Sequence, residues 1–234
     1  MVRSELVKQS PLRILDASTN GGVGKGNVGV LAARHGVGKT SALVHIATDK
    51  LLQGKHVIHV TFASRTVHII DYYEEIFTEI SKVKDLAGAM DLHDEIAPRR
   101  TVMSFDQKTT NTAHVIDSLR SRIHSGGFPA ELVIVDEFDF LHADLSDLML
   151  FKSFAKEEGL ELWFSISLDQ EGDFANQPVP VILERHLVNI DILINLRHHP
   201  DDGKVHLELV KDHGAKPKDM HLVLDTKTLL ISPE

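Results

Sequence analysis

The feature that most constrains this chain is a glycine-rich turn within residues 27–40. The apolar run N-V-G-V-L-A-A leads into R-H-G-V-G-K-T, and the residues after it carry apolar side chains at helical spacing as far as Gly54. A strand, a glycine-rich turn and a helix in this order are typical of a phosphate-binding loop. Its backbone N–H groups surround a phosphate at the N-terminus of the helix. The turn therefore predicts a nucleotide-binding α/β protein.

The loop supplies the expected nucleotide contacts. Lys39 is expected to reach the β- and γ-phosphates, and the Thr40 hydroxyl is expected to hold Mg²⁺. Ala33 stands at the first position of the pattern, where the strict form has glycine, so only a relaxed form is met. The alternative is a plain loop-to-helix turn with a chance G-K-T. The residues expected to bind the nucleotide are Ala33, Arg34, His35, Gly36, Val37, Gly38, Lys39, Thr40 and Ser41.

A second glycine cluster, G-G-V-G-K-G over residues 21–26, does not meet the same requirements. Gly26 stands where a Mg²⁺-binding hydroxyl is needed. A β-type run follows Lys25, so no helix N-terminus is present to receive a phosphate. We interpret this segment as a flexible approach to the first strand.

Composition favours one domain over residues 1–234, with residues 1–11 expected to be flexible. A hydrophobic fraction of 42% and a charged fraction of 25% are ordinary for a soluble globular protein. No apolar run approaches the ~18 residues that span a bilayer, and the start has no apolar core typical of a secretory signal. The absence of cysteine excludes disulfides and thiolate zinc sites. We therefore expect a cytoplasmic protein without a membrane partner.

Charge and histidine content bear on partners. The formal net charge is −9 and no dense Lys/Arg block is present, which argues against a protein that coats nucleic acid. The alternative is a small basic channel that forms on assembly. The 15 histidines are scattered, and no H-x-x-x-H pair has a carboxylate partner on a convincing helix. Structural roles for these histidines are favoured over a metal site.

The order of the predicted elements gives the fold class. Strands and helices alternate, which favours a mostly parallel central sheet with helices on both faces and ligands at the carboxyl ends of the strands. Short β-type runs within 191–232, joined by turn residues, predict a C-terminal antiparallel extension. The predicted strands are 56–63, 101–105, 131–136 and 161–168, and the predicted helices are 67–83, 85–97, 112–124 and 144–158.

The run E-L-V-I-V-D-E, residues 131–137, predicts the second half of the site. Asp136 would end a buried strand beside the loop, where its carboxylate can accept a hydrogen bond from a Mg²⁺-bound water. Glu137 follows directly and can orient or deprotonate the water that attacks the γ-phosphate. The alternative is that both acids are solvent-exposed residues that merely end the strand. For Glu137 the two interpretations are equally favoured. Asp139 is interpreted as a loop or cap residue.

Two further segments carry polar residues that could act on the nucleotide. Ser167, Asp169 and Gln170 lie at a strand end, where a polar side chain can sense the γ-phosphate; the start of a loop is an equal alternative. Lys211 and His213 lie at the end of a later strand and point the same way. Lys211 would stabilise transition-state charge at the nucleotide of a neighbouring subunit. Solvated turn charges are the alternative.

At motif level the chain resembles the RecA-like P-loop ATPases, in particular the KaiC/DnaB-like branch, from about residue 12 to 231. The likeness is carried by the lead-in N-G-G-V-G-K-G-N-V-G-V-L-A-A, the loop, the strand V-I-V-D and the terminal V-K-D-H-G. The resemblance implies a RecA-like fold, ATP and Mg²⁺ as cofactors, and a ring-like homo-oligomer in which a late β-hairpin acts across the subunit boundary. No guanine-reading N-K-x-D segment is present.

Two departures from the family pattern bear on hydrolysis. The family usually has a glutamate just after the second core strand, whereas residues 61–66 read T-F-A-S-R-T, with Ser64 and no acid. His213 stands where the family has arginine, and a neutral imidazole is a weaker transition-state cation. Glu137 is then the leading replacement base, with Glu74 and Glu75 as more distant candidates.

The leading hypothesis is a Mg²⁺-dependent ATPase with slow turnover. The first alternative is a nucleotide-dependent switch or scaffold without significant hydrolysis, which rests on the missing acid near Ser64. The second is a DNA repair or helicase-type accessory ATPase, which the acidic net charge disfavours.

Overall fold

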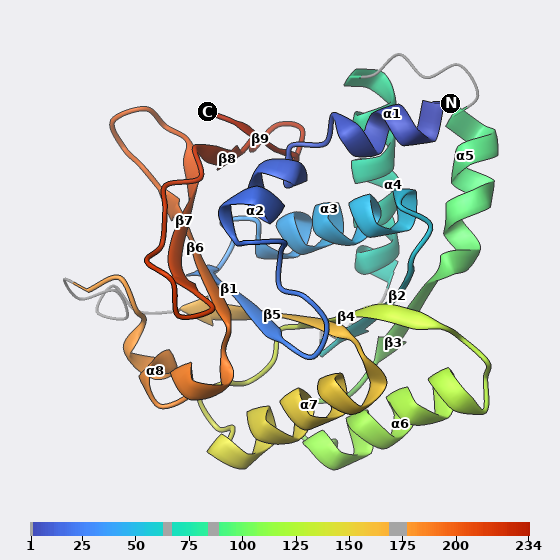
Figure 1. Cartoon of the computed structure of the whole chain (residues 1–234), viewed down its shortest axis with the longest axis vertical. Helices are drawn as coiled ribbons and strands as arrows, with labels where there is room; N and C mark the ends of the chain where they lie inside the picture. The colour runs from blue at the N-terminus through green and yellow to red at the C-terminus, as the bar shows by residue number, and fades with distance from the viewer. Residues whose placement is uncertain (1, 63–66, 84–88, 169–176) are drawn as a thin grey trace.

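One nine-stranded sheet, with helices on both faces, forms the centre of the part of the chain described by the computed structural model (Figure 1). That part comprises residues 2–62, 67–83, 89–168 and 177–234. The strand order is β3-β2-β4-β5-β1-β6-β7-β8-β9. Strands from β3 to β6 pair in parallel, and β6 to β9 pair antiparallel. The predicted fold class, with its C-terminal antiparallel extension, is confirmed.

The parallel strands are near-continuous apolar runs because helices cover both of their faces. In β1, for example, every residue except the last is buried. The predicted strands all form: the bounds of β5 are those predicted, and the ends of the other predicted strands differ by at most two residues. Their bounds are β1 Val28–Arg34, β2 His56–Thr61, β3 Arg100–Ser104, β4 Ala130–Asp136, β5 Glu161–Leu168, β6 Ile192–His198, β7 Val205–Asp212, β8 Leu222–Leu224 and β9 Ile231–Pro233.

The helices divide between two apolar cores, one on each face of the sheet. α1 to α5 contribute to one core, and α6 to α8 to the other, which lies below the sheet in Figure 1. Within the described residues none of these helices combines the length and the apolar composition that a membrane crossing requires. The bounds are α1 Val2–Lys8, α2 Leu12–Ser18, α3 Lys39–Leu52, α4 Val67–Val83, α5 Ala89–Ile96, η1 Ala97–Arg99, α6 Thr112–His124, α7 Leu145–Glu158, α8 Val181–Glu184 and η3 Leu187–Asn189.

The N-terminal region differs from the sequence expectation. The sequence predicts flexibility over residues 1–11, but α1 forms there and packs on α3. Leu6 is buried against the core, and the Arg3 Nε donates to the Leu52 carbonyl at 2.6 Å. At seven residues each, α1 and α2 are too short to show a helical period in sequence.

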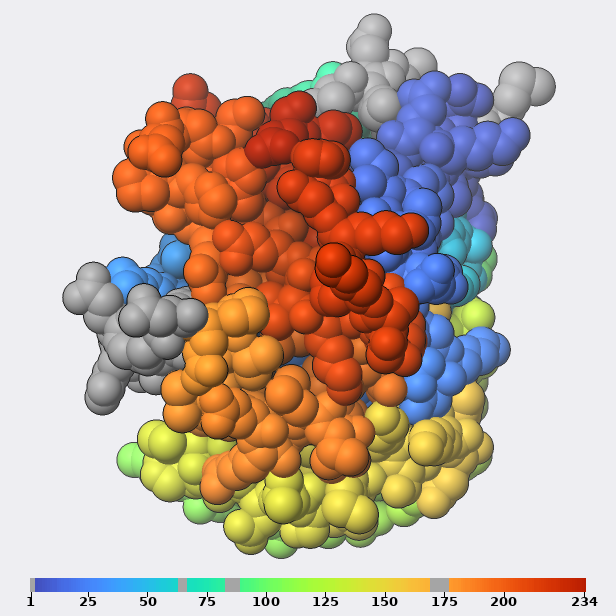
Figure 2. Space-filling view, turned by 60° about the vertical axis from the view of Figure 1, so that its left-hand side comes forward, coloured from blue at the N-terminus to red at the C-terminus, as the bar shows by residue number. Residues whose placement is uncertain are grey.

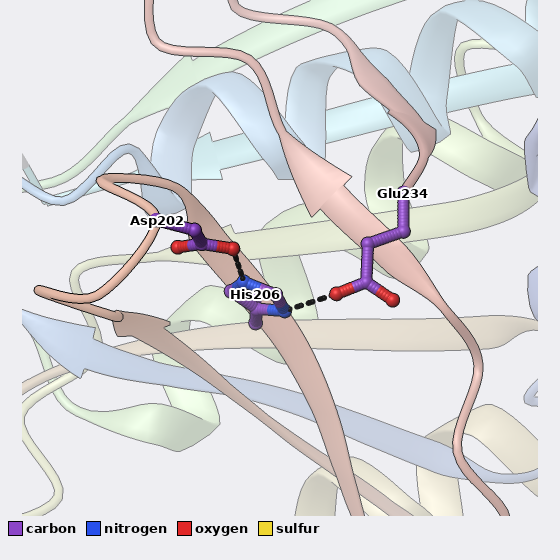
Figure 3. A group of neighbouring side chains, drawn as sticks. All are labelled: Asp202, His206 and Glu234. Carbon is purple, nitrogen blue, oxygen red and sulfur yellow. Dashed lines mark hydrogen bonds and ion pairs between the residues drawn. The ribbon is translucent and has the colours of Figure 1, made fainter.

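The C-terminal strands lie beside the N-terminal residues, and β8 packs against the phosphate loop. In Figure 2 the red and blue ends of the chain share one side of the molecule. His206 of β7 lies between two carboxylates (Figure 3): its Nε2 is 2.7 Å from Asp202 Oδ2 and its Nδ1 is 3.1 Å from Glu234 Oε1. Leu224 of β8 lies so close to Gly38 that a Cβ there would be 2.5 Å from its Cδ2.

Candidate functional site

The turn between β1 and α3 has the backbone that a phosphate site needs. Gly36 has φ +79° and Gly38 has φ +110°, a left-handed region that favours glycine. Gly38 is the N-cap of α3; no side chain caps this end, and its first turn has no acidic residue. The first amides of a helix have no intrahelical acceptors, and the helix dipole favours an anion beside them. The N-terminus of α3 is therefore suited to phosphate.

Lys39 begins α3 and points back over the loop. Its ammonium donates to the carbonyls of Ala33 at 3.3 Å and Arg34 at 3.1 Å, and the residue is only 7% exposed. Ala33 belongs to β1, whose extended backbone suits any residue, so glycine is not required at this first position of the motif. Arg34, His35 and Gly36 are exposed at the turn, and Ser41 is buried.

The structure brings Thr40 and Asp136 together. The Thr40 hydroxyl donates to Asp136 Oδ2 at 2.8 Å, although the two residues are 96 positions apart. The sheet explains the meeting, because β1 and β4 run parallel on either side of β5 and end at the same edge. Asp136 is 1% exposed. A hydroxyl and a carboxylate in contact beside the helix N-terminus are the two oxygen donors expected for Mg²⁺.

Ser165 of β5 organises this edge, and sequence reasoning missed it. Its hydroxyl donates to Asp136 Oδ1 and accepts the backbone N–H of Glu137 at 2.8 Å. Sequence reasoning selects Ser167, Asp169 and Gln170 instead, of which Asp169 and Gln170 lie outside the described residues. The signal for Ser165 is a polar residue inside an apolar strand, but its partner depends on β5 lying next to β4.

Glu137 lies at the tip of β4 with a left-handed backbone, φ +60°. Partial burial, together with the negative charge of Asp136, raises the pKa of its carboxyl group above the ordinary value of 4.5. Lys39 and His35 act in the opposite direction. A carboxylate with a raised pKa beside a phosphate loop is suited to accept a proton.

A cavity of about 430 Å³ opens beside these groups. Its lining includes Thr40, Asp136 and Glu137, so the three side chains border the same cavity. The remaining lining comes from the β8–β9 turn and from α4: His68, Ile69, Asp71, Tyr72, Glu75 and Leu229. Its volume lies within the ordinary range of ligand sites.

Glu74 and Glu75 of α4, which the sequence suggests as more distant bases, have different surroundings in the structure. Glu75 lines the cavity. Glu74 is outside this lining and pairs with His93 at 2.7 Å and with Arg100 at 3.3 Å. Of the two, Glu75 is therefore the one placed to act on a ligand.

His59 of β2 lies behind Asp136, and no motif in the sequence marks it as functional. It is fully buried, with Nε2 4.0 Å from Asp136 Oδ2 and Nδ1 3.1 Å from the Tyr73 hydroxyl. Burial lowers the pKa of His59 to about 4, so its imidazole is neutral at pH 7. Burial also raises the pKa of the Tyr73 hydroxyl.

Lys211 lies away from the phosphate loop of its own chain. It pairs in register with Leu193, near the start of β6. The phosphate loop follows the other end of the parallel strands. Its ammonium donates to the carbonyls of Leu187, at 2.6 Å, and Ile190. His213 lies beside it in sequence, with Nε2 3.0 Å from the Gly22 carbonyl oxygen. A role for Lys211 across a subunit boundary stays a prediction, and it would require the ammonium to leave both carbonyls.

A second group of potential metal ligands, Asp202, His206 and Glu234, lies at the start of β7. Both nitrogens of the His206 ring already face a carboxylate (Figure 3). These contacts are sufficient to explain the group as ion pairs that hold the residue after β9 against β7.

Comparison with known families matches the region that carries this geometry. A family model described as an AAA domain matches residues 23–170, which is more than half of the chain. The matched region runs from just before β1 to just after β5 and contains the phosphate loop, Asp136 and Glu137. A comparison with curated proteins gives no match.

Proposed function

Because the chain belongs to the family of AAA domains, which are P-loop ATPases, we propose that it binds ATP with Mg²⁺ and hydrolyses the ATP slowly. The observation that carries the proposal is the 2.8 Å contact between Thr40 and Asp136 beside the uncapped N-terminus of α3. A hydroxyl and a carboxylate that meet there from two distant segments supply the donors for a cation next to a phosphate.

The residues present fit the cation. Thr40 Oγ1 would be a direct ligand, and Asp136 would hold a cation-bound water. Bound Mg²⁺ supplies positive charge that offsets the charge of the β- and γ-phosphates. Lys39 would exchange the carbonyls of Ala33 and Arg34 for phosphate oxygens, because its ammonium already lies over the loop. The amides at the start of α3 would bind the β-phosphate.

Glu137 is the proposed base for hydrolysis, with Glu75 across the same cavity as the second candidate. The bond from its N–H to Ser165 fixes the backbone of Glu137 at the strand tip. Because its pKa is raised, the carboxylate of Glu137 is a stronger proton acceptor than that of an ordinary glutamate. Slow turnover is expected because residues 61–66 offer no glutamate.

One observation favours the alternative of a nucleotide-dependent switch. Among the described residues no hydrogen bond holds the Glu137 carboxylate, which lines a second cavity of about 810 Å³ as well as the first. A base that is not held in line with its water is a poor catalyst. Binding of ATP with negligible turnover would follow.

A RecA-like branch of the KaiC/DnaB kind, assembled as a ring, is the finer proposal. It is supported by the antiparallel strands β7 to β9 and by the terminal V-K-D-H-G. Light scattering with and without Mg-ATP tests it: we expect a multiple of the chain mass in the presence of Mg-ATP. A chain that stays monomeric in both conditions would contradict the ring and leave nucleotide binding untouched.

Replacement of Lys39 tests nucleotide binding. Lys39→Ala should weaken the affinity for a fluorescent ATP analogue by about tenfold or more, because hydrogen bonds to charged groups are worth about 1.5–3 kcal/mol. Lys25→Ala is the matched control, since Lys25 also follows a glycine but is exposed and precedes a strand. Unchanged affinity in the Lys39 variant, or an equal loss in both variants, would contradict the proposal.

A further inference from the structure

Among the residues that the structure describes, the buried imidazole of His59 on β2 has one nitrogen without a hydrogen-bond partner. His59 is 0% exposed, and within the described part of the chain its Nε2 has no partner. Buried polar atoms of this kind are few in folded proteins, because each has lost its hydration. The Asp136 carboxylate lies on this side of the ring, with Oδ2 4.0 Å from Nε2. The atom that lacks a partner therefore faces the proposed cation site.

Tyr73 holds the plane of this ring. Its hydroxyl is 3.1 Å from His59 Nδ1, and the two rings meet edge to face with centroids 5.7 Å apart. We assign the hydroxyl as the donor and Nδ1 as the acceptor, which leaves the ring proton on Nε2, directed at Asp136. Arg100 covers the Tyr73 ring at 4.4 Å and closes the network on the side of α4. The donor is therefore held in place before any ligand arrives.

The Asp136 carboxylate can accept a further hydrogen bond. Its carboxylate is almost fully buried and accepts two hydrogen bonds, from Thr40 and Ser165. An ionised carboxylate has about four acceptor sites. A third donor on the β2 side would fix the plane of the carboxylate and direct its remaining lone pairs toward a cation-bound water.

We propose that His59 is a positioning residue whose Nε2 N–H donates to Asp136 in the Mg²⁺-ATP state and so sets how strongly nucleotide affinity depends on Mg²⁺. This inference rests on the proposed ATP and Mg²⁺ site. Closure of the 4.0 Å gap requires Asp136 Oδ2 and His59 Nε2 to approach by about 1 Å, to the ordinary length of an N–H···O bond. His59 acts through Asp136 and touches neither the nucleotide nor the cation.

The test measures the affinity of a fluorescent non-hydrolysable ATP analogue with Mg²⁺ and with EDTA. The ratio of the two affinities is the Mg²⁺ enhancement. His59→Phe places an aromatic ring without nitrogens at the same buried position. It should reduce the enhancement by about tenfold or more while the affinity in EDTA is unchanged. His59→Gln, which returns an N–H near the position of Nε2, should recover most of the loss. Tyr73→Phe should cause a smaller loss in the same direction.

His45→Phe is the matched control. His45 lies on α3 with 3% exposure, and its Nδ1 accepts the Ile231 N–H at 2.9 Å. The loss of a buried histidine is the same, but the ring has no contact with Asp136. The enhancement should therefore stay at the wild-type value. In ¹⁵N-histidine-labelled protein, the Nε2 proton of His59 should shift downfield when Mg²⁺ is added with the analogue.

Two outcomes separate this inference from the proposed function. Wild-type protein that binds the analogue with a Mg²⁺ enhancement, together with a folded His59→Phe variant that keeps it, would overturn the role of His59 alone. Wild-type protein that does not bind the analogue would overturn the proposed function and this inference together. Should His59→Phe not fold, Tyr73→Phe decides: an undiminished enhancement there overturns the inference, and a reduced one supports it.

Discussion

The two glycine-rich segments of this chain, residues 21–26 and the phosphate loop at 33–40, contain the same G-K pair but lead into different elements. Both have glycines with positive φ, so backbone freedom does not distinguish them. Lys25 is exposed and leads into β1, whereas Lys39 is buried and begins α3. Only the second segment ends at a helix N-terminus and faces the tip of β4. A phosphate site is thus defined by the element after the glycines and by the strand opposite.

The largest expected effect tests the strand opposite the phosphate loop. Glu137→Gln should lower the kcat for ATP hydrolysis by about 10²–10⁴-fold, the usual contribution of a general base. Nucleotide affinity should change little. Glu74→Gln is the control, because Glu74 is engaged with His93 and Arg100 outside the cavity. Equal rates in both variants and in the wild type would remove Glu137 from the reaction and leave Glu75→Gln as the next variant to measure.

Removal of the negative charge at Asp136 tests whether the tip of β4 contributes to binding of the cation. Asp136→Asn should reduce the affinity for Mg-ATP by about ten- to a hundredfold, since hydrogen bonds to a charged group are worth about 1.5–3 kcal/mol. The affinity in EDTA should change less. Asp139→Asn, three residues along, removes a carboxylate that pairs with His142 at 2.6 Å, and it should have no such effect. Calorimetric titration checks both variants, and the same loss in each would mean that net charge alone is responsible.

The glycines themselves provide a stability comparison. Gly38→Ala should destabilise the protein by about 2 kcal/mol or more, because a left-handed residue with a Cβ costs about 1–2 kcal/mol and this Cβ would lie 2.5 Å from Leu224 Cδ2. Gly24→Ala has the same type of backbone, but its nearest atom is Asn27 Nδ2 at 3.4 Å, so about 1 kcal/mol is expected. Urea denaturation measures the free energy of unfolding of both variants. A larger loss for Gly24→Ala would contradict the packing of β8 on the loop.

The smallest expected effect is on the pH dependence of hydrolysis. Glu137 acts as a base only when ionised, and its pKa is raised above 4.5 by burial and by Asp136. Activity should therefore be present at neutral pH and fall as the pH is lowered, with a midpoint above that of an ordinary glutamate. A pH profile of kcat checks this. A kcat that stays constant across the pH range in which a carboxylate titrates would show that Glu137 is not the titrating base.

Much of this architecture could be predicted from sequence because it depends on local periodicity. The helix over residues 67–83 forms with the predicted bounds, since its apolar residues repeat over several turns. The parallel strands are recognisable as apolar runs between helices. Helices α1 and α2 were missed because seven residues hold too few turns for a pattern.

Only half of the site could be predicted, for a different reason. Lys39, Thr40 and Asp136 are marked by their own neighbours in sequence. Ser165 and His59 owe their place to the strand order, in which β4 lies between β2 and β5. Nothing in the local sequence states that order, so both resemble ordinary strand residues. The position of Lys211, away from the phosphate loop, likewise results from the pairing of β7 with β6.

The most direct measurement of the central claim is a calorimetric titration of ATP into the wild-type protein and into Thr40→Val, each with Mg²⁺ and with EDTA. We predict one nucleotide per wild-type chain, bound more tightly with Mg²⁺, and no Mg²⁺ enhancement in Thr40→Val, whose side chain keeps its shape but loses the hydroxyl. Equal affinity in Mg²⁺ and EDTA for the wild type, or an undiminished enhancement in Thr40→Val, would contradict the claim.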